Sequence, residues 1–340
     1  MTKSVFRSLR FLKYATIPRI INAIGLYLSF HYSRISGKNY HIGMPLSFAI
    51  EPTTACNLRC PECPSGLRSF TRPTGNLNQD LFRQVIDQVA IKTMYLTFYF
   101  QGEPYLNPDF LEMVSYASSK NIITSTSTNA HFLDDELAER TVRSGLDRLI
   151  ISIDGTDQKT YESYRKEGNL EKVIEGTKKI IQWKKKLKSK TPFVEFQFLV
   201  VRPNEHQIDE VRKLGKELSV DNVVLKTAQI YNFENGNDLI PLNSKYSRYK
   251  KSKSGEYTIK NNLLNQCWRM WSSCVITWDG KVVPCCFDKD ASHTLGDVRE
   301  NNFLKIWKGE HYENFRKAIL IGRSEIDICR NCSEGTKVWM

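Results

Sequence analysis

Residues 47–63, SFAIEPTTACNLRCPEC, place three cysteines in a short loop directly after an apolar run that is typical of a β-strand. The cysteines, Cys56, Cys60 and Cys63, have C-x3-C-x2-C spacing. Three thiolates in one loop can hold one corner of an iron–sulfur cube, with each sulfur bound to a separate iron. The fourth iron is then open to bind and activate a small molecule, as the open position of a catalytic zinc is. A structural zinc site is the alternative, but it needs four ligands, and no histidine lies close to this loop in the sequence.

The segment that follows alternates between strand-like and helix-like runs as far as Lys226. Apolar runs predict strands at 47–51, 94–100, 122–128, 148–153, 193–201 and 222–226. Runs with mixed charge predict helices at 78–90, 109–120, 134–144, 170–188 and 208–218. Strands that alternate with helices of this length indicate βαβ units and a parallel sheet. Since no glycine-rich dinucleotide fingerprint follows the first strand, we expect an α/β fold built as a partial (β/α)6 TIM-like barrel.

Polar residues follow each predicted strand and mark one rim of this barrel. In parallel α/β folds, the chemistry gathers at the carboxyl ends of the strands. The three cysteines follow the first strand, and the other polar clusters lie at 101–104, 128–129, 152–155, 202–204 and 226. We therefore expect the active site at this rim.

Six of the nine cysteines lie after the alternation stops near Gly236: Cys267, Cys274, Cys285, Cys286, Cys329 and Cys332. The total is odd, and seven of the nine fall into three closely spaced groups, which indicates metal binding rather than disulfides. We also expect a polar linker or loop at 243–256, a hairpin at 279–280 and a helix near 301–320. The predicted domains are a basic amphipathic extension at 1–46, a core at 47–235 and a small cysteine-rich C-terminal domain at 236–340.

The N-terminal extension carries much of the net charge of +12. Its basic residues are Lys3, Arg7, Arg10, Lys13, Arg19, Arg34 and Lys38, and the first acidic residue of the chain is Glu51. The apolar run at 15–30 is too short to span a membrane and is interrupted by Arg19 and Asn22. Its isoleucines recur at helical spacing, which favours either a helix that lies in an anionic membrane surface or a helix that caps the barrel. Because the charge is outside the core, no nucleic-acid partner is expected.

The C-x3-C-x2-C loop resembles that of the radical S-adenosylmethionine (SAM) superfamily. The sequence QGEP at 101–104 resembles the superfamily's GGEP motif, with Gln101 in place of the first glycine. STNA at 127–130 and SIDG at 152–155 are similar to its S-T-N-G and S-x-D-G stretches. Arg165 resembles an arginine that meets the SAM carboxylate in relatives, and a surface position on a helix is the alternative. Glu62 stands before the third cysteine, where the superfamily usually has an aromatic residue.

This resemblance implies a [4Fe–4S] cluster on Cys56, Cys60 and Cys63, with an open iron that chelates SAM. It also implies a SAM-binding set, which comprises Gly102, Glu103, Asn129, Ser152, Asp154 and Arg165. Reduction of such a cluster cleaves SAM to methionine and a 5′-deoxyadenosyl radical, which abstracts a hydrogen atom from a substrate. No catalytic residue beyond the cluster ligands is identified.

The C-terminal cysteines resemble the SPASM/Twitch extension found in many radical SAM enzymes. The spacing Cys267-x12-Gly280-x4-Cys285, followed by Cys329-x2-Cys332, implies one auxiliary [4Fe–4S] cluster with four protein ligands. Cys274 and Cys286 have no regular partners, so a second auxiliary cluster is not expected. A four-cysteine zinc ribbon is the alternative for this region.

We therefore expect a cytoplasmic radical SAM oxidoreductase that receives electrons from a donor such as flavodoxin or ferredoxin. Its substrate is a peptide, a small alcohol or sugar, or a lipid or cell-envelope molecule. The basic N-terminus suggests the last of these and allows peripheral contact with the inner face of the membrane. The alternative is a non-catalytic, membrane-associated iron–sulfur or zinc protein that acts as a scaffold or redox sensor. The SAM motifs at the other strand ends favour the enzyme.

Overall fold

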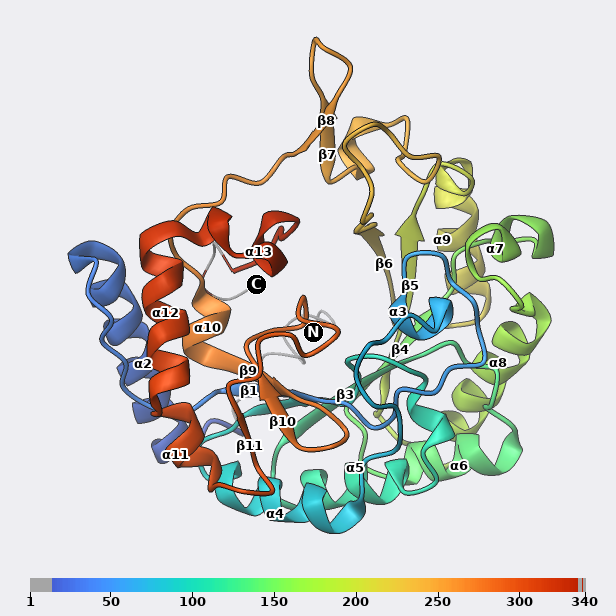
Figure 1. Ribbon diagram of the computed structural model, residues 1–340. Coiled ribbons are helices and arrows are strands. Elements are labelled where there is room, and N and C mark those ends of the chain that lie inside the picture. Colours follow the sequence, from blue (N-terminus) through green and yellow to red (C-terminus); the bar gives the residue numbers. More distant parts are fainter. Residues whose placement is uncertain (1–13, 336–337, 339–340) are drawn as a thin grey trace.

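Nine strands form one mixed sheet in the computed structural model, which describes residues 14–335 and 338. Six of them are parallel and lie side by side in chain order: β1 (Ser47–Ile50), β2 (Tyr95–Thr97), β3 (Ile123–Thr128), β4 (Arg148–Ser152), β5 (Phe193–Val200) and β6 (Asn222–Thr227). Within the described residues the sheet has two edges, at β6 and β11, so the barrel is partial. Figure 1 shows the sheet curving around a central space. The predicted parallel α/β architecture is confirmed.

Helices cover the outside of this curved sheet (Figure 1). They are α4 (Gln79–Val89), α5 (Phe110–Ser119), α6 (Asp135–Arg143), α7 (Gln158–Tyr164), α8 (Leu170–Lys186) and α9 (Ile208–Glu217). Asn78, Asp134, Asp157 and Asn169 cap four of them by accepting hydrogen bonds from backbone N–H groups of the first turn. In α4, Phe82, Val85, Ile86 and Val89 form the buried stripe, because residues three and four apart share one helix face.

The C-terminal cysteine region extends the same sheet. Strand β9 (Ser273–Ile276) pairs parallel to β1, and β10 (Lys281–Val283) and β11 (Gly296–Asp297) follow as antiparallel neighbours. The expected hairpin at 279–280 therefore joins β9 to β10. The expected helix near 301–320 is two helices, α11 (Phe303–Trp307) and α12 (Glu310–Gly322), because the extended backbone of Gly309 separates them.

The segment at 243–256, which was expected to be a linker or loop, instead contains one side of a small hairpin. Strands β7 (Tyr249–Lys251) and β8 (Tyr257–Ile259) pair antiparallel, and Tyr249 is buried. Gly255, with φ of 96°, supplies the left-handed residue of the turn. Figure 1 shows this hairpin projecting from the body of the molecule. The remaining short helices are α3 (Pro64–Leu67), α10 (Trp268–Ser272), α13 (Asp327–Arg330), η1 (Pro104–Leu106), η2 (Glu205–Gln207), η3 (Ser244–Tyr246) and η4 (Arg323–Glu325).

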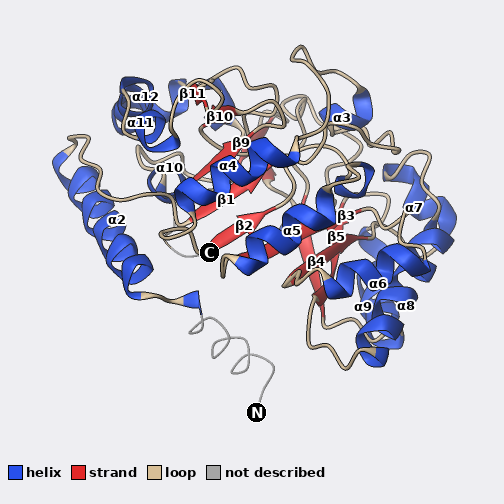
Figure 2. Ribbon diagram, turned by 90° about the horizontal axis from the view of Figure 1, so that it is seen from below, coloured by secondary structure: helices blue, strands red, loops and turns tan. Residues whose placement is uncertain are grey.

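The N-terminal extension contains a long helix, α2 (Ile17–Ser36), that packs against α10 at one side of the molecule (Figures 1 and 2). Lys3, Arg7, Arg10 and Lys13 lie outside the described residues. A membrane-spanning helix needs a longer apolar run than any helix in the described part of the chain provides. This agrees with the expectation that the run at 15–30 does not span.

Candidate active site

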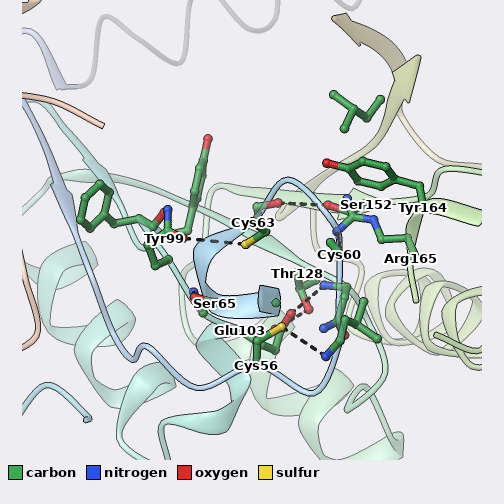
Figure 3. A pocket seen from close by; sticks show the side chains of 18 residues that line it. Cys56, Cys60, Cys63, Ser65, Tyr99, Glu103, Thr128, Ser152, Tyr164 and Arg165 are labelled. Carbon is green, nitrogen blue, oxygen red and sulfur yellow. Dashed lines mark hydrogen bonds between the residues drawn. The ribbon is translucent and has the colours of Figure 1, made fainter. Parts of the chain in front are cut away.

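The three cysteines of the first loop lie together in a pocket at the carboxyl ends of the parallel strands (Figure 3). Five of the six residues expected to bind SAM line the same pocket: Gly102, Glu103, Asn129, Ser152 and Arg165. These residues come from the ends of β2, β3 and β4 and from the end of α7. The fold therefore brings together side chains that are more than 100 residues apart in the sequence.

Cys60 is buried, and Cys56 and Cys63 are partly buried. Burial raises the pKa of Cys56 to about 12, with further upward contributions from the neighbouring Glu103, Cys63 and Cys60. Burial also raises the pKa of Cys60, and the nearby Arg165 opposes this shift. Without metal the thiols of Cys56 and Cys60 are neutral, and a bound metal group would hold them as thiolates because it stabilises the deprotonated form.

Gly102 holds the loop after β2 against the cysteine loop. Its backbone N–H donates to Ser65 Oγ at 2.9 Å, and the N–H of Glu103 donates to the carbonyl of Ala55 at 2.7 Å. Its φ is 74°, and a Cβ at this position would lie 2.2 Å from the carbonyl oxygen of Thr53. Only glycine therefore fits this close approach of two backbones.

The Glu103 carboxylate links the ends of β2 and β3. One oxygen accepts from Thr128 Oγ1 at 2.7 Å, and the other accepts from the Asn129 N–H at 2.7 Å. Burial raises the pKa of Glu103 to about 7, although these hydrogen bonds act in the opposite direction. The Asn129 side chain donates from Nδ2 to Asn57 Oδ1, in the cysteine loop, at 2.7 Å.

Arg165 points into the pocket and not onto the surface. Its side chain is 17% exposed, its Nε lies 2.5 Å from Asp154 Oδ2, and its Nη1 lies 3.8 Å from Cys60 Sγ. Asp154 is fully buried behind it and also accepts from the Leu199 N–H at 2.6 Å. Asp154 thus differs from the other five residues of the expected set, because it orients Arg165 and does not line the pocket.

The two departures from the superfamily motifs have clear places in the structure. The Gln101 side chain is buried against Cys63, whose Sγ lies 3.8 Å from Gln101 Oε1. Glu62 accepts from the Tyr231 N–H at 2.9 Å and so ties the cysteine loop to the segment after β6. Tyr99 and Tyr164 also line the pocket. Sequence reasoning missed Tyr99, since a single tyrosine after a strand carries no motif, whereas Tyr164 belongs to the Tyr164-Arg165 segment that resembles the superfamily's arginine stretch.

Three cysteines of the C-terminal region lie around one buried arginine, and a fourth lies near two of these three. Cys267, Cys329 and Cys332 all act on the charge of Arg323 and raise its pKa, and Arg323 Nη2 donates to Cys332 Sγ at 3.3 Å. Cys285 is close enough to Cys267 and Cys332 that their charges raise its pKa, although burial is the largest cause. The structure therefore brings together all four cysteines expected to hold the auxiliary cluster.

The two remaining cysteines have different surroundings. Cys274 lies in β9 within the main core, beside Tyr312 and Arg316. Cys286 lies near Arg269 and Glu334, which form an ion pair at 3.0 Å. Cys274 therefore lies apart from the four cysteines, whereas Cys286 directly follows Cys285 and its charge also raises the pKa of Cys285.

Both cysteine groups suit iron–sulfur clusters in their chemistry. No group of three or more His, Cys, Asp or Glu side chains in the described residues is arranged to hold a single metal ion. The fit therefore rests on the donors themselves, which are three thiols in a pocket and four thiols beside a buried cation. Thiolates are the usual ligands of such clusters, and a neighbouring cation stabilises the negative charge of a four-thiolate site.

Comparison with known proteins agrees with both motif sets. Residues 50–214 match the model of the radical SAM superfamily, and residues 267–333 match the model of SPASM, an iron–sulfur cluster-binding domain. The chain is 25% identical over 297 residues to the tungsten-containing aldehyde ferredoxin oxidoreductase cofactor-modifying protein of Pyrococcus furiosus. This match covers 78% of this chain and 82% of that protein. It is also 26% identical over 307 residues to the AdoMet-dependent heme synthase of Methanosarcina barkeri, and this match covers 80% of this chain and 84% of that protein.

A solved structure of SuiB from Streptococcus suis bound to S-adenosylmethionine superposes with a TM-score of 0.62. The identity is 14%, and the match covers 89% of this chain and 74% of that chain. At this identity the likeness shows the fold alone.

Proposed function

The chain belongs to the radical SAM superfamily and carries a C-terminal SPASM domain, and from this premise we propose that the pocket reductively cleaves SAM in order to oxidise a substrate. The observation that carries the proposal is the shared pocket of Cys56, Cys60 and Cys63 with five residues of the SAM-binding set. A [4Fe–4S] cluster and SAM, when bound, supply a 5′-deoxyadenosyl radical that takes a hydrogen atom from the substrate.

The residues around the pocket have separable roles in this proposal. Cys56, Cys60 and Cys63 hold the cluster, and Gly102, Glu103, Asn129, Ser152 and Arg165 seat SAM. Asp154 acts as a positioning residue, because its ion pair fixes the guanidinium of Arg165 beside Cys60. Tyr99, Phe100 and Tyr164 line the pocket with aromatic surface that excludes water from the reacting atoms.

The C-terminal site supplies the argument for net oxidation. An auxiliary [4Fe–4S] cluster bound by Cys267, Cys285, Cys329 and Cys332 would have a protein ligand on each of its four irons. Because no iron is then open, such a cluster suits electron transfer better than substrate binding. Such a cluster would accept the electron that the substrate gives up after hydrogen abstraction. A small donor such as flavodoxin or ferredoxin would supply the first electron, and the reaction would take place in the cytoplasm.

The substrate is proposed only as a class. The relatives are named as a cofactor-modifying protein and a heme synthase, and a solved structure of SuiB is bound to a precursor peptide. A peptide, a small alcohol or sugar, and a lipid or cell-envelope molecule each fit an oxidation that begins with hydrogen abstraction. No nucleic-acid partner is proposed.

The test is SAM cleavage by the anaerobically reconstituted protein. With SAM and dithionite, the wild-type chain should form 5′-deoxyadenosine and methionine, measured by liquid chromatography and mass spectrometry. Cys60→Ala should abolish the product, because it removes a cluster ligand from the pocket. Gly102→Ala should nearly abolish it as well, since the added Cβ would lie 2.2 Å from the Thr53 carbonyl oxygen.

The matched control is Cys274→Ala, which removes a core thiol outside both groups and should leave SAM cleavage intact. Bound zinc, or bound iron with no SAM cleavage under any reductant, would instead support a non-catalytic scaffold or redox sensor.

A further inference from the structure

The helix α2 presents its polar side to the protein and its apolar side to the surroundings. Of its six buried residues, Arg19, Asn22, Ser29 and Ser33 are polar, and Leu26 and Phe30 are apolar. Arg19 donates to the carbonyls of Asn121 and Ala90 at 2.6 and 2.9 Å. Asn22 makes two hydrogen bonds of 2.8 Å with the backbone of Met44. These contacts fix the rotation of the helix on the body of the protein.

The opposite face of α2 is a continuous apolar stripe. Its exposed members are Ile17 (74%), Ile20 (45%), Ile21 (65%), Ile24 (53%), Leu28 (60%) and Ile35 (80%). Tyr27 and Tyr32 flank the stripe and are 42% and 53% exposed. A helix on the surface of a globular protein normally shows the reverse pattern, with its apolar stripe inward. An exposed apolar patch of this kind marks a binding surface.

The charge around the stripe identifies the kind of surface that it fits. Arg34 and Lys38 lie at the end of the helix, and both are exposed. Lys3, Arg7, Arg10 and Lys13 precede it in the sequence, and no acidic residue occurs before Glu51. An apolar helix face among basic residues complements a membrane surface that contains anionic lipids. A soluble acidic protein would match the charge but would not need a stripe of six large aliphatic side chains on one helix face.

We propose that α2 is a monotopic anchor, which lies flat in the surface of an anionic membrane with its isoleucine stripe in the apolar layer. The helix does not need to span the bilayer, because its inward face is already bonded to the protein. The tyrosines at the edges of the stripe suit the headgroup region, where an aromatic ring with a polar tip is favoured. This inference does not depend on the chemistry proposed for the pocket.

The test is co-sedimentation of the full-length, cluster-loaded protein with lipid vesicles. The wild-type protein should bind vesicles of phosphatidylglycerol and phosphatidylcholine, and it should bind pure phosphatidylcholine vesicles much more weakly. Binding should also weaken in high salt, because salt screens the attraction to anionic lipid. Ile21→Glu with Leu28→Glu should reduce the partition coefficient by at least roughly tenfold, because each change removes a large apolar side chain from the membrane. The same variant should retain the wild-type Tm and iron content, since both residues are exposed.

The control variant is Leu242→Glu, which places the same charge at an apolar residue that is 77% exposed. Leu242 bonds through its N–H to Glu205, near β5 and β6 and far along the sheet from α2, so this variant should bind vesicles like the wild type. The proposal is overturned if the wild type does not bind anionic vesicles, or if the two α2 substitutions leave binding unchanged. It is also overturned if the wild type is a dimer by light scattering and the same substitutions make it a monomer, because a second copy then covers the stripe.

Discussion

Arg323 is buried beside the C-terminal cysteines without an acidic partner in the described part of the chain. Its side chain is fully buried and donates to Cys332 Sγ at 3.3 Å and to the carbonyls of Gln266 and Glu334 at 2.8 and 2.7 Å. A buried cation without a carboxylate is costly unless another negative group lies next to it. The four thiolates of the proposed auxiliary cluster would provide that negative group.

Replacing Arg323 should therefore change the potential of the auxiliary cluster. Arg323→Gln should lower its midpoint potential by on the order of 100 mV, because a charge a few Å away contributes a few kcal/mol at an effective dielectric constant of about 20. Arg323→Lys keeps the charge and should shift the potential less. A redox titration followed by electron paramagnetic resonance measures both values. Equal midpoint potentials in the wild type and in Arg323→Gln would show that the charge of Arg323 does not act on the auxiliary cluster.

At the scale of single residues, the sequence predicts which cysteines of the first loop lie together, and the structure places all three in one pocket. Cysteine spacing is a local property, so the sequence alone assigns Cys56, Cys60 and Cys63 to one site. Arg323 and Tyr99 were not predicted, because their roles depend on which distant groups the fold brings beside them. Asp154 was placed at the right rim, but its position behind Arg165 follows from side-chain geometry, which motif matching does not contain.

Among the elements, the end of β1 is joined to the segment after the cysteine loop by a buried ion pair. Arg72, which follows the cysteine loop, bonds both oxygens of Glu51 at 2.6 and 2.8 Å, and the side chains are 4% and 0% exposed. Glu51 also accepts from the N–H of Trp278, which lies in the turn between β9 and β10. This cluster therefore connects the first strand, the cysteine loop and the C-terminal hairpin.

Removing one partner of this pair should be strongly destabilising. Arg72→Met should cost about 3–5 kcal/mol of unfolding free energy, because it leaves the Glu51 carboxylate buried without its partner. Adding Glu51→Gln should restore part of the loss. Arg143→Met is a matched control that breaks the surface pair with Glu139 and should cost less than about 1 kcal/mol. Thermal unfolding followed by circular dichroism ranks the three variants, and a double variant no more stable than Arg72→Met would contradict this account.

The segment between α2 and β1 contains a partly buried histidine with a low pKa. Burial is the main cause that lowers the pKa of His41 to about 3, and its Nε2 lies 3.1 Å from the Trp271 carbonyl. The unfolded chain, with a histidine pKa near 6.5, binds a proton that the folded chain does not accept. The contribution of His41 to stability is therefore full above about pH 6.5 and is lost progressively as the pH falls towards 3.

Replacing His41 by glutamine should remove this acid sensitivity. Between pH 7.5 and pH 5.5 the free energy of unfolding should fall by roughly 1.4 kcal/mol more in the wild type than in His41→Gln. This corresponds to a difference in Tm of roughly 2–4 °C. Scanning calorimetry of the two proteins at both pH values measures it. Parallel changes in Tm would show that His41 is protonated in the folded protein.

For the whole molecule, the sequence predicted the order of elements better than their final arrangement. All six parallel strands and the five long helices between them were predicted, because hydrophobic periodicity is local, whereas the short helices α3 and α7 were not. The pairing of β9 with β1 joins residues more than 220 positions apart and has no local signal. The orientation of α2 was likewise ambiguous, because isoleucines at helical spacing predict an apolar face but do not indicate whether that face packs against the protein or is exposed.

The central claim is that the pocket holds a cluster with an iron open to SAM and that the C-terminal site holds a closed cluster. Electron paramagnetic resonance of the reduced protein, recorded with and without SAM, tests it most directly. The account predicts two cluster signals in the wild type, of which one changes when SAM is added. In the Cys329→Ala, Cys332→Ala variant only the SAM-sensitive signal should remain. A spectrum that SAM leaves unchanged, or a SAM-sensitive signal that is lost with Cys329 and Cys332, would contradict it.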